Sequence, residues 1–463
     1  MVEGTRKSAD QPSAISLQSA QQQVMRAAEV ARTAATAMSV TREKVRDAAL
    51  KNIVKELEHA QDQILEANEI DLERAQELAR TGSLSQSLIA RLRLDKSKLE
   101  GIIEGVIRVA ELSDPLGQVT LARELDNQLQ LFRVSCPIGL IAVIFESRPD
   151  ALPQIASLCL KSGNAAILKG GKEARVTNRV LFECIERACT RAHLPPNVFT
   201  LLETRESIEA LLKADKFIDL IIPRGSNELV RYIQDNTRIP VLGHADGLCH
   251  LYVDRTANIA TATKVVLDSK VQYPAACNAI ETLLVHESIA RKFLASVVPE
   301  LLSRGVELRC DSAISLMLPK ALRTQVKPSQ ESDWSTEYSD MILSVKAMNS
   351  LNDAIRHINK YGSHHTDGII TEDEKAFDQF FSQVHSAGVY WNASTRFADG
   401  FRYGFGAEVG ISTGKMHPRG PVGLEGLVTY KYKVVGKGHI VSDYVGENAR
   451  RFTHKTLFED GSI

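Results

Sequence analysis

The chain has 463 residues, and its 56 basic and 57 acidic side chains leave a net charge of −1 at pH 7. This length suffices for two or three domains with a sizeable core. The balanced charge argues against a nucleic-acid or anionic-membrane partner, and the longest apolar run, residues 138–145, is too short to cross a bilayer. Seven scattered cysteines do not resemble a disulfide framework. We expect no secretory signal and a reducing, cytoplasmic setting.

The first part of the chain shows a helical pattern. Residues 1–20 are rich in Ser and Gln and predict a mobile extension. From there to about residue 112 the pattern is helical, with Gly82 as a helix stop and Asp95 as the N-cap of the last helix. The sequence Asp-Pro-Leu-Gly at 114–117 then predicts a turn.

A β-hairpin is predicted next. Residues 121–137 alternate between apolar and polar side chains, with Asp126-Asn127 at the centre. A hairpin that projects between helical and α/β parts often serves subunit contacts. Plain exposure to solvent is an equal alternative.

The chain then alternates between strands and helices. Strands are predicted at residues 138–145, 165–168, 198–202 and 217–222, and helices at 150–161, 173–191, near Ser207 and at 226–234. This alternation predicts an α/β fold with a parallel, doubly wound sheet.

A second α/β series is predicted from about Asn258. It comprises helices at 258–270, 353–360 and 375–385 and strands at 280–285, 368–371 and 388–391. Residues 308–338 show an irregular, partly acidic pattern. The charged tail, residues 436–463, predicts a strand followed by a surface extension.

One cysteine, Cys277, stands at a predicted bend between a helix and a strand, in the stretch VQYPAACNAIETLLV. The small side chains of Ala275 and Ala276 leave room for a ligand beside it. A thiol in that position suits covalent acyl chemistry, because the attacking species is the thiolate. An arbitrary cysteine is more often a buried core residue, and this alternative stands beside the catalytic one.

Two strand-to-helix turns carry glycine and positive charge. The first is Lys-Gly-Gly-Lys at 169–172, and the second is Arg-Gly-Ser at 224–226. Both follow predicted parallel strands, where open α/β sheets bind ligands, and glycine lets a phosphate approach the backbone. Neither turn matches the GxGxxG or P-loop pattern, but two such turns ahead of a candidate nucleophile favour a dinucleotide site. The candidate cofactor-binding residues are Lys169, Gly170, Gly171, Lys172, Gly225 and Ser226.

Six longer motifs carry a family resemblance. They are VSCPIGLIAVIFESRPD (134–150), NAAILKGGKEA (164–174), IPRGSNELV (222–230), VLGHADGLCHLYVD (241–254), YPAACNAIETLLVH (273–286) and FGAEVGISTGKMHPRGPVGLEGL (405–427). With these motifs in this order, the chain resembles the aldehyde dehydrogenase superfamily over about residues 20–433. Within the superfamily it resembles the enzymes that reduce glutamyl phosphate in proline biosynthesis.

The resemblance implies an aldehyde dehydrogenase-like α/β fold with a Rossmann-like cofactor domain, an α/β catalytic domain and a β-hairpin oligomerisation element. It implies Cys277 as the nucleophile, NADPH as the cofactor held by the two glycine turns, and a homo-oligomer, either a dimer or a tetramer. Lys169 and Lys172 are compatible with the 2′-phosphate of NADPH. The expected domain limits are 21–117 and 136–257 for cofactor binding, 258–410 for catalysis, 118–135 and 411–435 for oligomerisation, and 1–20 and 436–463 for terminal extensions.

One departure from the wider superfamily bears on the reaction. Oxidising aldehyde dehydrogenases carry a glutamate before a Leu-Gly-Gly motif, and this glutamate activates water against the thioester. Here Val241 precedes Leu-Gly-His. Without that base, a thioester at Cys277 should last long enough to exchange with phosphate or to be reduced. A base supplied by Glu281 or Asp246 is the alternative.

Further site residues are implied by their places in the motifs. Ser147 aligns with the superfamily's oxyanion asparagine and joins the Cys277 backbone N–H as a candidate donor, and Asn392 matches an asparagine near the active site. The candidate substrate-binding residues are Arg148, His244, Asp246, Lys415 and Arg419. A structural ion pair is the alternative for the cations, a turn hydrogen bond for Asn392, and a satisfied loop pair for His244 and Asp246.

No metal site is expected. His364 and His365 are adjacent and would point to opposite faces of a strand. No clustered carboxylate completes a site with them.

The resemblance therefore implies NADPH-dependent reduction of L-glutamyl 5-phosphate to L-glutamate 5-semialdehyde, with release of phosphate, through a Cys277 thioester. Functional coupling to glutamate 5-kinase is an expected partnership. Two alternatives stay open: an NAD(P)-dependent aldehyde dehydrogenase in the oxidising direction, and a non-catalytic oligomeric homologue that kept the fold.

Overall fold

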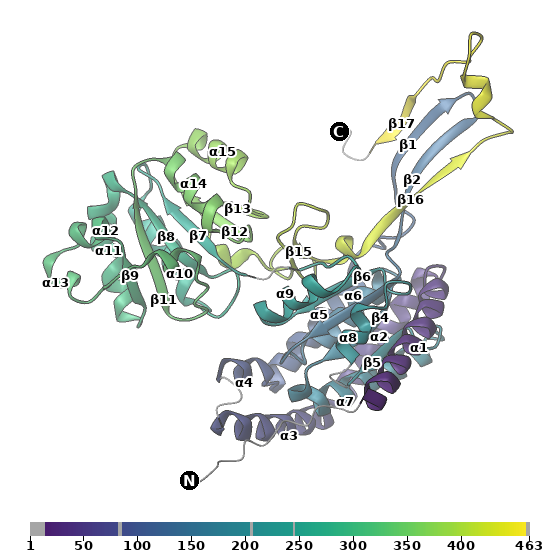
Figure 1. The fold of residues 1–463 in the computed structure, drawn as a ribbon, viewed down its shortest axis with the longest axis horizontal. Helices are drawn as coiled ribbons and strands as arrows, with labels where there is room; N and C mark the ends of the chain where they lie inside the picture. The colour runs from purple at the N-terminus through teal and green to yellow at the C-terminus, as the bar shows by residue number, and fades with distance from the viewer. Residues whose placement is uncertain (1–13, 82–85, 204–206, 244–245, 460–463) are drawn as a thin grey trace. The chain divides into compact units, whose positions relative to one another are not determined.

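The computed structural model describes residues 14–81, 86–203, 207–243 and 246–459, and the chain divides into two compact units (Figure 1). Unit 1 comprises residues 1–225, 233–241 and 427–463, and unit 2 comprises residues 226–232 and 242–426. None of the described helices combines the length and apolarity that a bilayer crossing demands.

Unit 1 begins with five helices: α1 (Ala14–Met38), α2 (Glu43–His59), α3 (Gln61–Arg80), α4 (Gln86–Leu92) and α5 (Lys96–Glu111). The Asp95 side chain accepts a hydrogen bond from Lys98 N at 2.8 Å, which confirms the predicted N-cap. Residues 14–20, expected in a mobile extension, form the start of α1, because no glycine or proline interrupts the helical run there. Residues 1–13 lie outside the described residues.

The first sheet is parallel, with the strand order β5-β4-β3-β6. Its elements in chain order are β3 (Leu140–Phe145), α6 (Ala151–Lys161), β4 (Ala165–Gly170), η1 (Lys172–Ala174), α7 (Arg175–Arg191), β5 (Phe199–Leu202), α8 (Ser207–Leu212), β6 (Leu220–Arg224) and α9 (Asn227–Asn236). All residues of β3 and β4 are buried, as parallel strands between helical layers should be. The predicted α/β alternation is confirmed. The strand order reverses at β3, and open α/β sheets bind ligands at such a switch point, here the carboxyl ends of β3 and β6.

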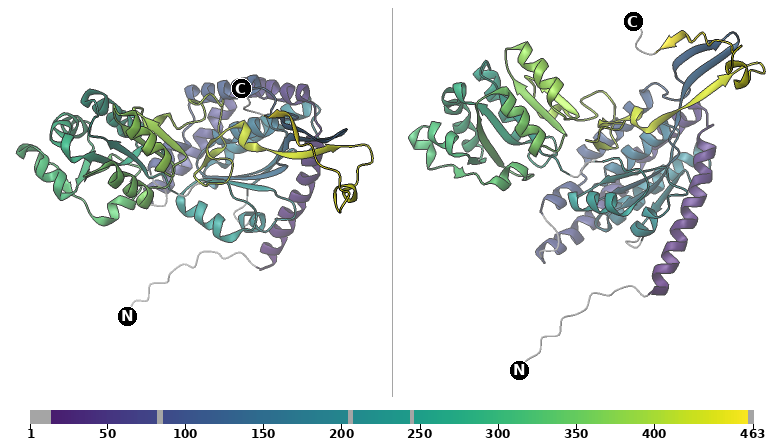
Figure 2. Two further views of the ribbon diagram at one scale, coloured as in Figure 1. Left: turned by 90° about the horizontal axis from the view of Figure 1, so that it is seen from above. Right: turned by 45° about the horizontal axis from the view of Figure 1, so that its top comes forward.

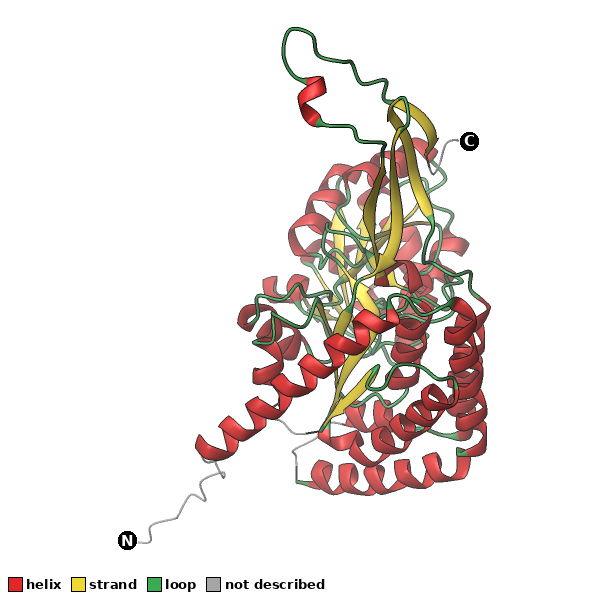
Figure 3. Ribbon diagram, turned by 90° about the vertical axis from the view of Figure 1, so that its right-hand side faces the viewer, coloured by secondary structure: helices red, strands yellow, loops and turns green. Residues whose placement is uncertain are grey.

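A second, antiparallel sheet has the order β16-β2-β1-β17, and β1, β2 and β16 run side by side in Figures 1 and 3. Its elements are β1 (Val119–Asp126), β2 (Leu129–Pro137), β16 (Val428–Val435), η5 (Val441–Tyr444) and β17 (Lys455–Glu459). The predicted hairpin is confirmed, with its turn at Asn127-Gln128 and Gln128 at φ 61°. The tail contains a strand, as predicted, but this strand, β17, comes late in the tail and pairs with β1, so that it covers that edge of the sheet.

Unit 2 is built on a parallel sheet of seven strands in the order β10-β9-β11-β8-β7-β12-β13. Its strands are β7 (Cys249–Val253), β8 (Ile280–His286), β9 (Glu307–Cys310), β10 (Lys327–Pro328), β11 (Ile342–Met348), β12 (Thr366–Ile370) and β13 (Gly388–Trp391). Its helices are α10 (Ile259–Val271), α11 (Glu287–Ser303), α12 (Ser312–Met317), α13 (Lys320–Arg323), η2 (Glu331–Ser335), α14 (Leu351–Tyr361), α15 (Glu374–Gln383), η3 (Thr395–Phe397) and η4 (Leu424–Leu427).

Alternate residues of this sheet face two separate apolar cores. Leu283 and Val285 pack with α10, α11 and α12, whereas Leu284 packs with α14 and α15. Figure 2 shows helices of this unit on both sides of the sheet. A small antiparallel pair, β14 (Gly410–Ser412) and β15 (Gly420–Val422), forms a sheet of its own.

The second α/β series departs from the prediction in three places. It begins at β7, before the expected start near Asn258, because β7 pairs with β8 and β12. Residues 308–338, expected to be irregular, contribute β9, β10 and short helices to the ordered sheet edge. The strand β11, which joins β9 to β8, was not predicted.

Candidate active site

Cys277 lies on the turn that joins α10 to β8, so the predicted bend is confirmed. Backbone hydrogen bonds tighten this turn: Ala276 N donates to Tyr273 O at 3.2 Å and Ala279 N donates to Ala276 O at 2.9 Å. The cysteine is half-buried, whereas residues 280–285 of the strand that follows, β8, are all buried. The turn therefore holds a partly accessible thiol at the amino-terminal end of the sheet of unit 2.

The backbone of Cys277 rests against Gly247. A Cβ atom at position 247 would lie 2.6 Å from both the Cα and the carbonyl oxygen of Cys277, a separation that real side chains do not reach. Gly247 N donates to Glu337 Oε2 at 2.9 Å, and the Cys249 thiol donates to the Cys277 carbonyl at 3.2 Å. The chain leading into β7 therefore packs against the Cys277 turn and fixes its position. We did not predict a role for Gly247; its place in Gly-His-Ala-Asp-Gly was the available signal.

Asp246 is held by two donors. Asn227 Nδ2 donates to its Oδ1 at 2.8 Å, and Arg231 forms an ion pair with its Oδ2 at 2.6 Å. Asn227 Nδ2 also reaches Glu337 Oε2 at 3.1 Å. This carboxylate therefore ties its loop to α9. The other predicted residue of that loop, His244, lies outside the described residues.

Glu281 forms a buried ion pair with Lys270, at 2.7 Å between Oε2 and Nζ. Its Oε1 accepts a hydrogen bond from Ser339 N at 3.0 Å. Burial raises the pKa of Glu281 and lowers the pKa of Lys270, while each partner opposes the shift of the other. The two carboxylates considered as alternative bases, Glu281 and Asp246, are thus both engaged in ion pairs.

Asn392 makes two hydrogen bonds to the backbone of Thr371. Thr371 N donates to Asn392 Oδ1 at 3.0 Å, and Asn392 Nδ2 donates to Thr371 O at 2.9 Å. Both residues follow strands, β13 and β12, whereas Cys277 precedes β8 in the same parallel sheet. This geometry supports the turn alternative for Asn392, and its catalytic role stays a prediction.

Lys415 and Arg419 are exposed on the loop between β14 and β15. Arg419 donates to the His385 carbonyl. Burial lowers the pKa of His364, and the charges of His385, Arg419 and Lys415 lower it further, so both cations lie near this histidine. His364 precedes β12 as Cys277 precedes β8, which places the two cations and the thiol toward the same edge of one parallel sheet.

In unit 1, the first glycine turn follows β4. Lys169 is buried, and its ammonium donates to Gly170 O at 2.6 Å, whereas Lys172 is exposed. A Cβ at Gly170 would lie 2.3 Å from Asn178 Nδ2, and one at Gly171 would lie 2.0 Å from Glu173 Oε1. A side chain at either position would have to displace the side-chain end of Asn178 or Glu173. It places backbone and two lysines at the carboxyl end of β4.

Ser147 follows β3, the neighbour of β4, and has a left-handed backbone with φ 43°. Its N–H and its hydroxyl both donate to Glu173 Oε1, at 2.6 and 2.8 Å. Such a strained conformation in a non-glycine residue is typical of functional turns. Next to it, Arg148 pairs with Asp150 at 3.3 Å. The oxyanion role of Ser147 and the substrate role of Arg148 stay predictions.

The second glycine turn follows β6. Gly225 and Ser226 are exposed, and Ser226 Oγ accepts a hydrogen bond from Leu229 N at 3.4 Å at the start of α9. Arg224 O accepts a hydrogen bond from Glu146 N at 2.9 Å, which joins the ends of β3 and β6. The structure thus brings the turn after β4, Ser147 and Arg224-Gly225 to one edge of the first sheet.

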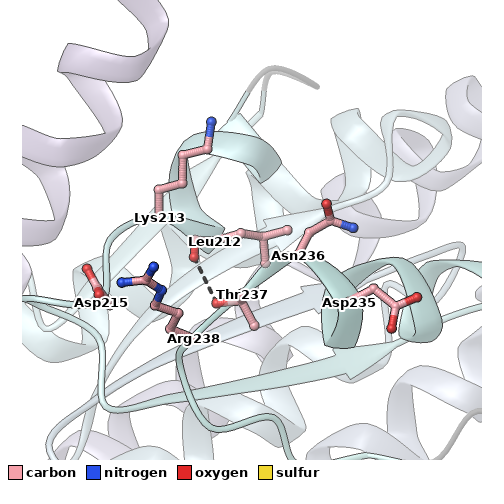
Figure 4. Close-up of a pocket in the computed structure, with 7 residues that line it drawn as sticks. All are labelled: Leu212, Lys213, Asp215, Asp235, Asn236, Thr237 and Arg238. Carbon is pink, nitrogen blue, oxygen red and sulfur yellow. Dashed lines mark hydrogen bonds between the residues drawn. The ribbon is translucent and has the colours of Figure 1, made fainter.

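A pocket of about 490 Å³ lies beyond the carboxyl-terminal ends of α8 and α9 (Figure 4). It is lined by Leu212, Lys213, Asp215, Asp235, Asn236, Thr237 and Arg238. None of these lining residues belongs to the predicted site. The pocket is therefore separate from the two glycine turns.

Residues 6–314 match the model of the aldehyde dehydrogenase family. The chain belongs to the aldehyde dehydrogenase family. It is accordingly an oxidoreductase, and the predicted aldehyde dehydrogenase-like α/β fold is confirmed.

Within this family, the chain is similar to gamma-glutamyl phosphate reductases. The chain is 53% identical to gamma-glutamyl phosphate reductase of Methanosarcina acetivorans over 428 residues, which covers 92% of this chain and 96% of the relative. It is 53% identical to the gamma-glutamyl phosphate reductase of Trichodesmium erythraeum, with 92% and 97% covered. The crystal structure of gamma-glutamyl phosphate reductase from Thermotoga maritima superposes with a TM-score of 0.85 at 37% identity, covering 90% of this chain and 99% of that one. The predicted resemblance to enzymes that reduce glutamyl phosphate is confirmed.

Proposed function

We propose that this chain catalyses the NADPH-dependent reduction of L-glutamyl 5-phosphate to L-glutamate 5-semialdehyde, with release of phosphate, in proline biosynthesis. The proposal rests mainly on the position of Cys277 on the α10–β8 turn, in a chain more than half identical to gamma-glutamyl phosphate reductases. The coarser assignment, an oxidoreductase of the aldehyde dehydrogenase family, stands independently of it.

The reaction follows from thiolate chemistry. The Cys277 thiolate attacks the γ-carbonyl carbon, the bond from that carbon to the phosphate oxygen breaks, and phosphate leaves with its electron pair. A thioester remains on the sulfur. Hydride addition to the thioester carbonyl and cleavage of the carbon–sulfur bond release the aldehyde and restore the thiolate. The Cys277 backbone N–H and Ser147 are the candidate donors to the oxyanion.

Three residues suit a thioester at Cys277 that resists water. Val241 stands where an oxidising aldehyde dehydrogenase carries its glutamate base. Glu281 is buried in its pair with Lys270, and Asp246 is paired with Arg231. These contacts count against the oxidising alternative, because no carboxylate considered for the role is left to activate water.

The cofactor site suggested by the residues is the carboxyl edge of the first sheet. The bare backbone at Gly170-Gly171 and the lysines at 169 and 172 fit the phosphates of a dinucleotide, and Gly225 and Ser226 lie at the neighbouring strand end. NADPH bound there supplies the hydride. The preference for NADPH over NADH rests on the family resemblance and on the charge of Lys169 and Lys172.

The substrate carries negative charge that the chain must balance. Lys415 and Arg419 lie toward the same sheet edge as Cys277 and are our candidates for the phosphate or the α-carboxylate. Arg148 and His244 are further candidates. We further propose a dimer or tetramer, coupling to glutamate 5-kinase and a cytoplasmic location. The exposed Tyr430 and Tyr432 on β16 support an oligomer contact on that strand.

The test runs the reaction backwards, because the acyl phosphate is labile. NADPH formation from L-glutamate 5-semialdehyde and NADP is followed with and without inorganic phosphate, in the wild type, in Cys277→Ala and in Cys136→Ala. Cys136 is the matched control, since it is the other half-buried cysteine. The proposal is supported if NADPH forms only with phosphate, if Cys277→Ala abolishes this turnover, and if Cys136→Ala preserves it. Equal turnover without phosphate would show a hydrolytic enzyme, and an inactive wild type would favour the non-catalytic alternative.

A further inference from the structure

A buried arginine, Arg396, contacts the nucleophile turn. Arg396 lies on η3, and only 8% of its surface is exposed. Its Nε donates to Gln272 Oε1 at 2.9 Å, and its guanidinium carbon lies 5.8 Å from the centroid of the Tyr273 ring. A buried guanidinium needs such partners to offset the loss of water. Both of these partners stand on the segment 272–279, which carries Cys277.

The segment around Arg396 also binds the other side of the turn. Asn278 Nδ2 donates to Ala398 O at 2.8 Å, immediately after the nucleophile. At the end of α10, Ser269 Oγ lies 3.2 Å from Ser394 Oγ and accepts a hydrogen bond from Thr395 N at 3.3 Å. Residues 394–398 therefore contact the chain both before and after Cys277.

Charged groups converge on Arg396 from several elements. Burial lowers its pKa and the neighbouring Arg402 lowers it further, whereas Cys277, Asp399 and Asp268 raise it. Because such interactions are mutual, a positive Arg396 favours a negative Cys277.

Four other ionisable groups near the turn form two pairs. Arg402 lies 3.5 Å from Asp399, and Lys270 pairs with Glu281. A further neighbour, the Cys249 thiol, donates to the Cys277 carbonyl. None of these pairs reaches both flanks of Cys277 as the Arg396 segment does.

We propose that Arg396 is a positioning residue for Cys277: it holds the nucleophile turn through Gln272 and Tyr273, and its positive charge favours the reactive thiolate. This inference rests on the proposed role of Cys277 as nucleophile. A substrate-binding role for Arg396 predicts a different result, because losing a substrate contact raises KM, whereas losing the position of the nucleophile lowers kcat.

The experiment uses the full-length enzyme and four variants: Arg396→Gln, Arg396→Lys, Gln272→Ala and the control Arg304→Gln. Arg304 lies at the end of α11 and pairs with Glu300 on the surface. The rate of Cys277 alkylation by iodoacetamide is measured as a function of pH by peptide mass spectrometry. Steady-state kcat and KM are measured in parallel, and circular dichroism checks the fold.

We expect Arg396→Gln to raise the apparent pKa of the thiol by about one unit, which slows alkylation roughly tenfold at neutral pH. Its kcat should fall by roughly 10- to 100-fold with little change in KM. Arg396→Lys should restore the pKa but not the full kcat, because the ammonium lacks the guanidinium fork. Gln272→Ala should lower kcat while the pKa stays, since it removes a contact and no charge. Arg304→Gln should match the wild type.

A pH profile of folded Arg396→Gln that overlays the wild type would overturn the proposal, as would a rise in KM alone. If Arg396→Gln does not fold, the same outcomes are read from Arg396→Lys and Gln272→Ala: wild-type kcat in both would overturn it. The alkylation assay needs no substrate. A wild type that lacks glutamyl phosphate reductase activity but shows the Arg396-dependent thiol pKa therefore refutes the proposed function and supports this inference.

Discussion

Gly247 lies so close to Cys277 that a methyl group at position 247 would stand 2.6 Å from the Cα of the cysteine. The contact is between backbones, so no side-chain rotation relieves it. Gly247 N is fixed in turn by Glu337 Oε2 at 2.9 Å. The position of Cys277 is thus set by the loop that leads into β7 as well as by its own turn.

Gly247→Ala should therefore displace the turn that carries Cys277. Catalytic geometry tolerates little displacement, and we expect kcat to fall by about 100-fold while the chain stays folded. Steady-state kinetics and circular dichroism check this. Gly105→Ala, in the helix α5 with no atom within 4 Å of the new Cβ, is the control and should leave kcat unchanged. Wild-type kcat in Gly247→Ala would show that the turn is not held by this contact.

Arg46 should contribute strongly to the stability of unit 1. It is 2% exposed, pairs with Asp114 at 2.6 Å and donates to the carbonyl of Lys161. Arg46→Met leaves these acceptors without their donor, and we expect a loss of about 3 kcal/mol in the free energy of unfolding. Arg80, with 76% of its side chain exposed, is the control, and Arg80→Met should cost less than about 0.5 kcal/mol. Urea denaturation measures both, and equal losses would refute the prediction.

His357 should make the stability of unit 2 depend on pH. Burial, then the charges of His250, Lys346 and Lys360, lower the pKa of His357 from 6.5 to about 2. Below pH 6.5 the unfolded chain binds a proton at this histidine and the folded chain does not. The free energy of unfolding therefore decreases by about 1.4 kcal/mol for each unit by which the pH is lowered.

His357→Phe should remove that share of the slope between about pH 6 and 4. The fluorescence of Trp334, whose ring centroid lies 5.5 Å from that of His357, reports the unfolding of this region. Parallel slopes in the wild type and the variant would show that His357 titrates normally in the folded chain.

The tail should protect an edge of the antiparallel sheet. β17 pairs with β1 from Leu121 to Glu124, and without it those backbone groups would be exposed. An uncovered strand edge is a template for pairing with other chains. We expect deletion of residues 455–463 to increase light scattering as the protein concentration rises. Deletion of residues 460–463 alone, which spares β17, is the control, and equal scattering from both deletions would contradict this role.

Local patterns sufficed for much of this architecture. The strand-turn-helix pattern at Lys169–Lys172 and the bend at Cys277 were predictable, because residue type and spacing within a short window determine them. The pairing of β17 with β1 was not, because it joins residues more than 300 positions apart. β9 was not predicted because it has only four residues, alternately half-buried and buried. An apolar-polar alternation cannot be recognised in so short a segment.

Two residues of the candidate site, Gly247 and Arg396, could not be predicted from the sequence because their contacts are with distant parts of the chain. The role of Gly247 depends on the close approach of two loops, which a single sequence does not record. Arg396 is likewise defined by its contacts with Gln272 and Tyr273, which lie far away along the chain. Conversely, a sequence motif suggested a catalytic role for Asn392. In the structure the side-chain amide of Asn392 is hydrogen-bonded to the backbone of Thr371. A motif predicts that a segment lies near the site more reliably than it predicts what each side chain does.

The proposed thioester on Cys277 can be observed directly. The wild type is mixed with L-glutamate 5-semialdehyde and NADP without phosphate, and intact-protein and peptide mass spectrometry follow Cys277. We expect one glutamyl group on Cys277 that persists in water, forms along with one equivalent of NADPH, and is released when inorganic phosphate is added. Absence of that adduct, or its steady hydrolysis to glutamate without phosphate, would contradict the proposal.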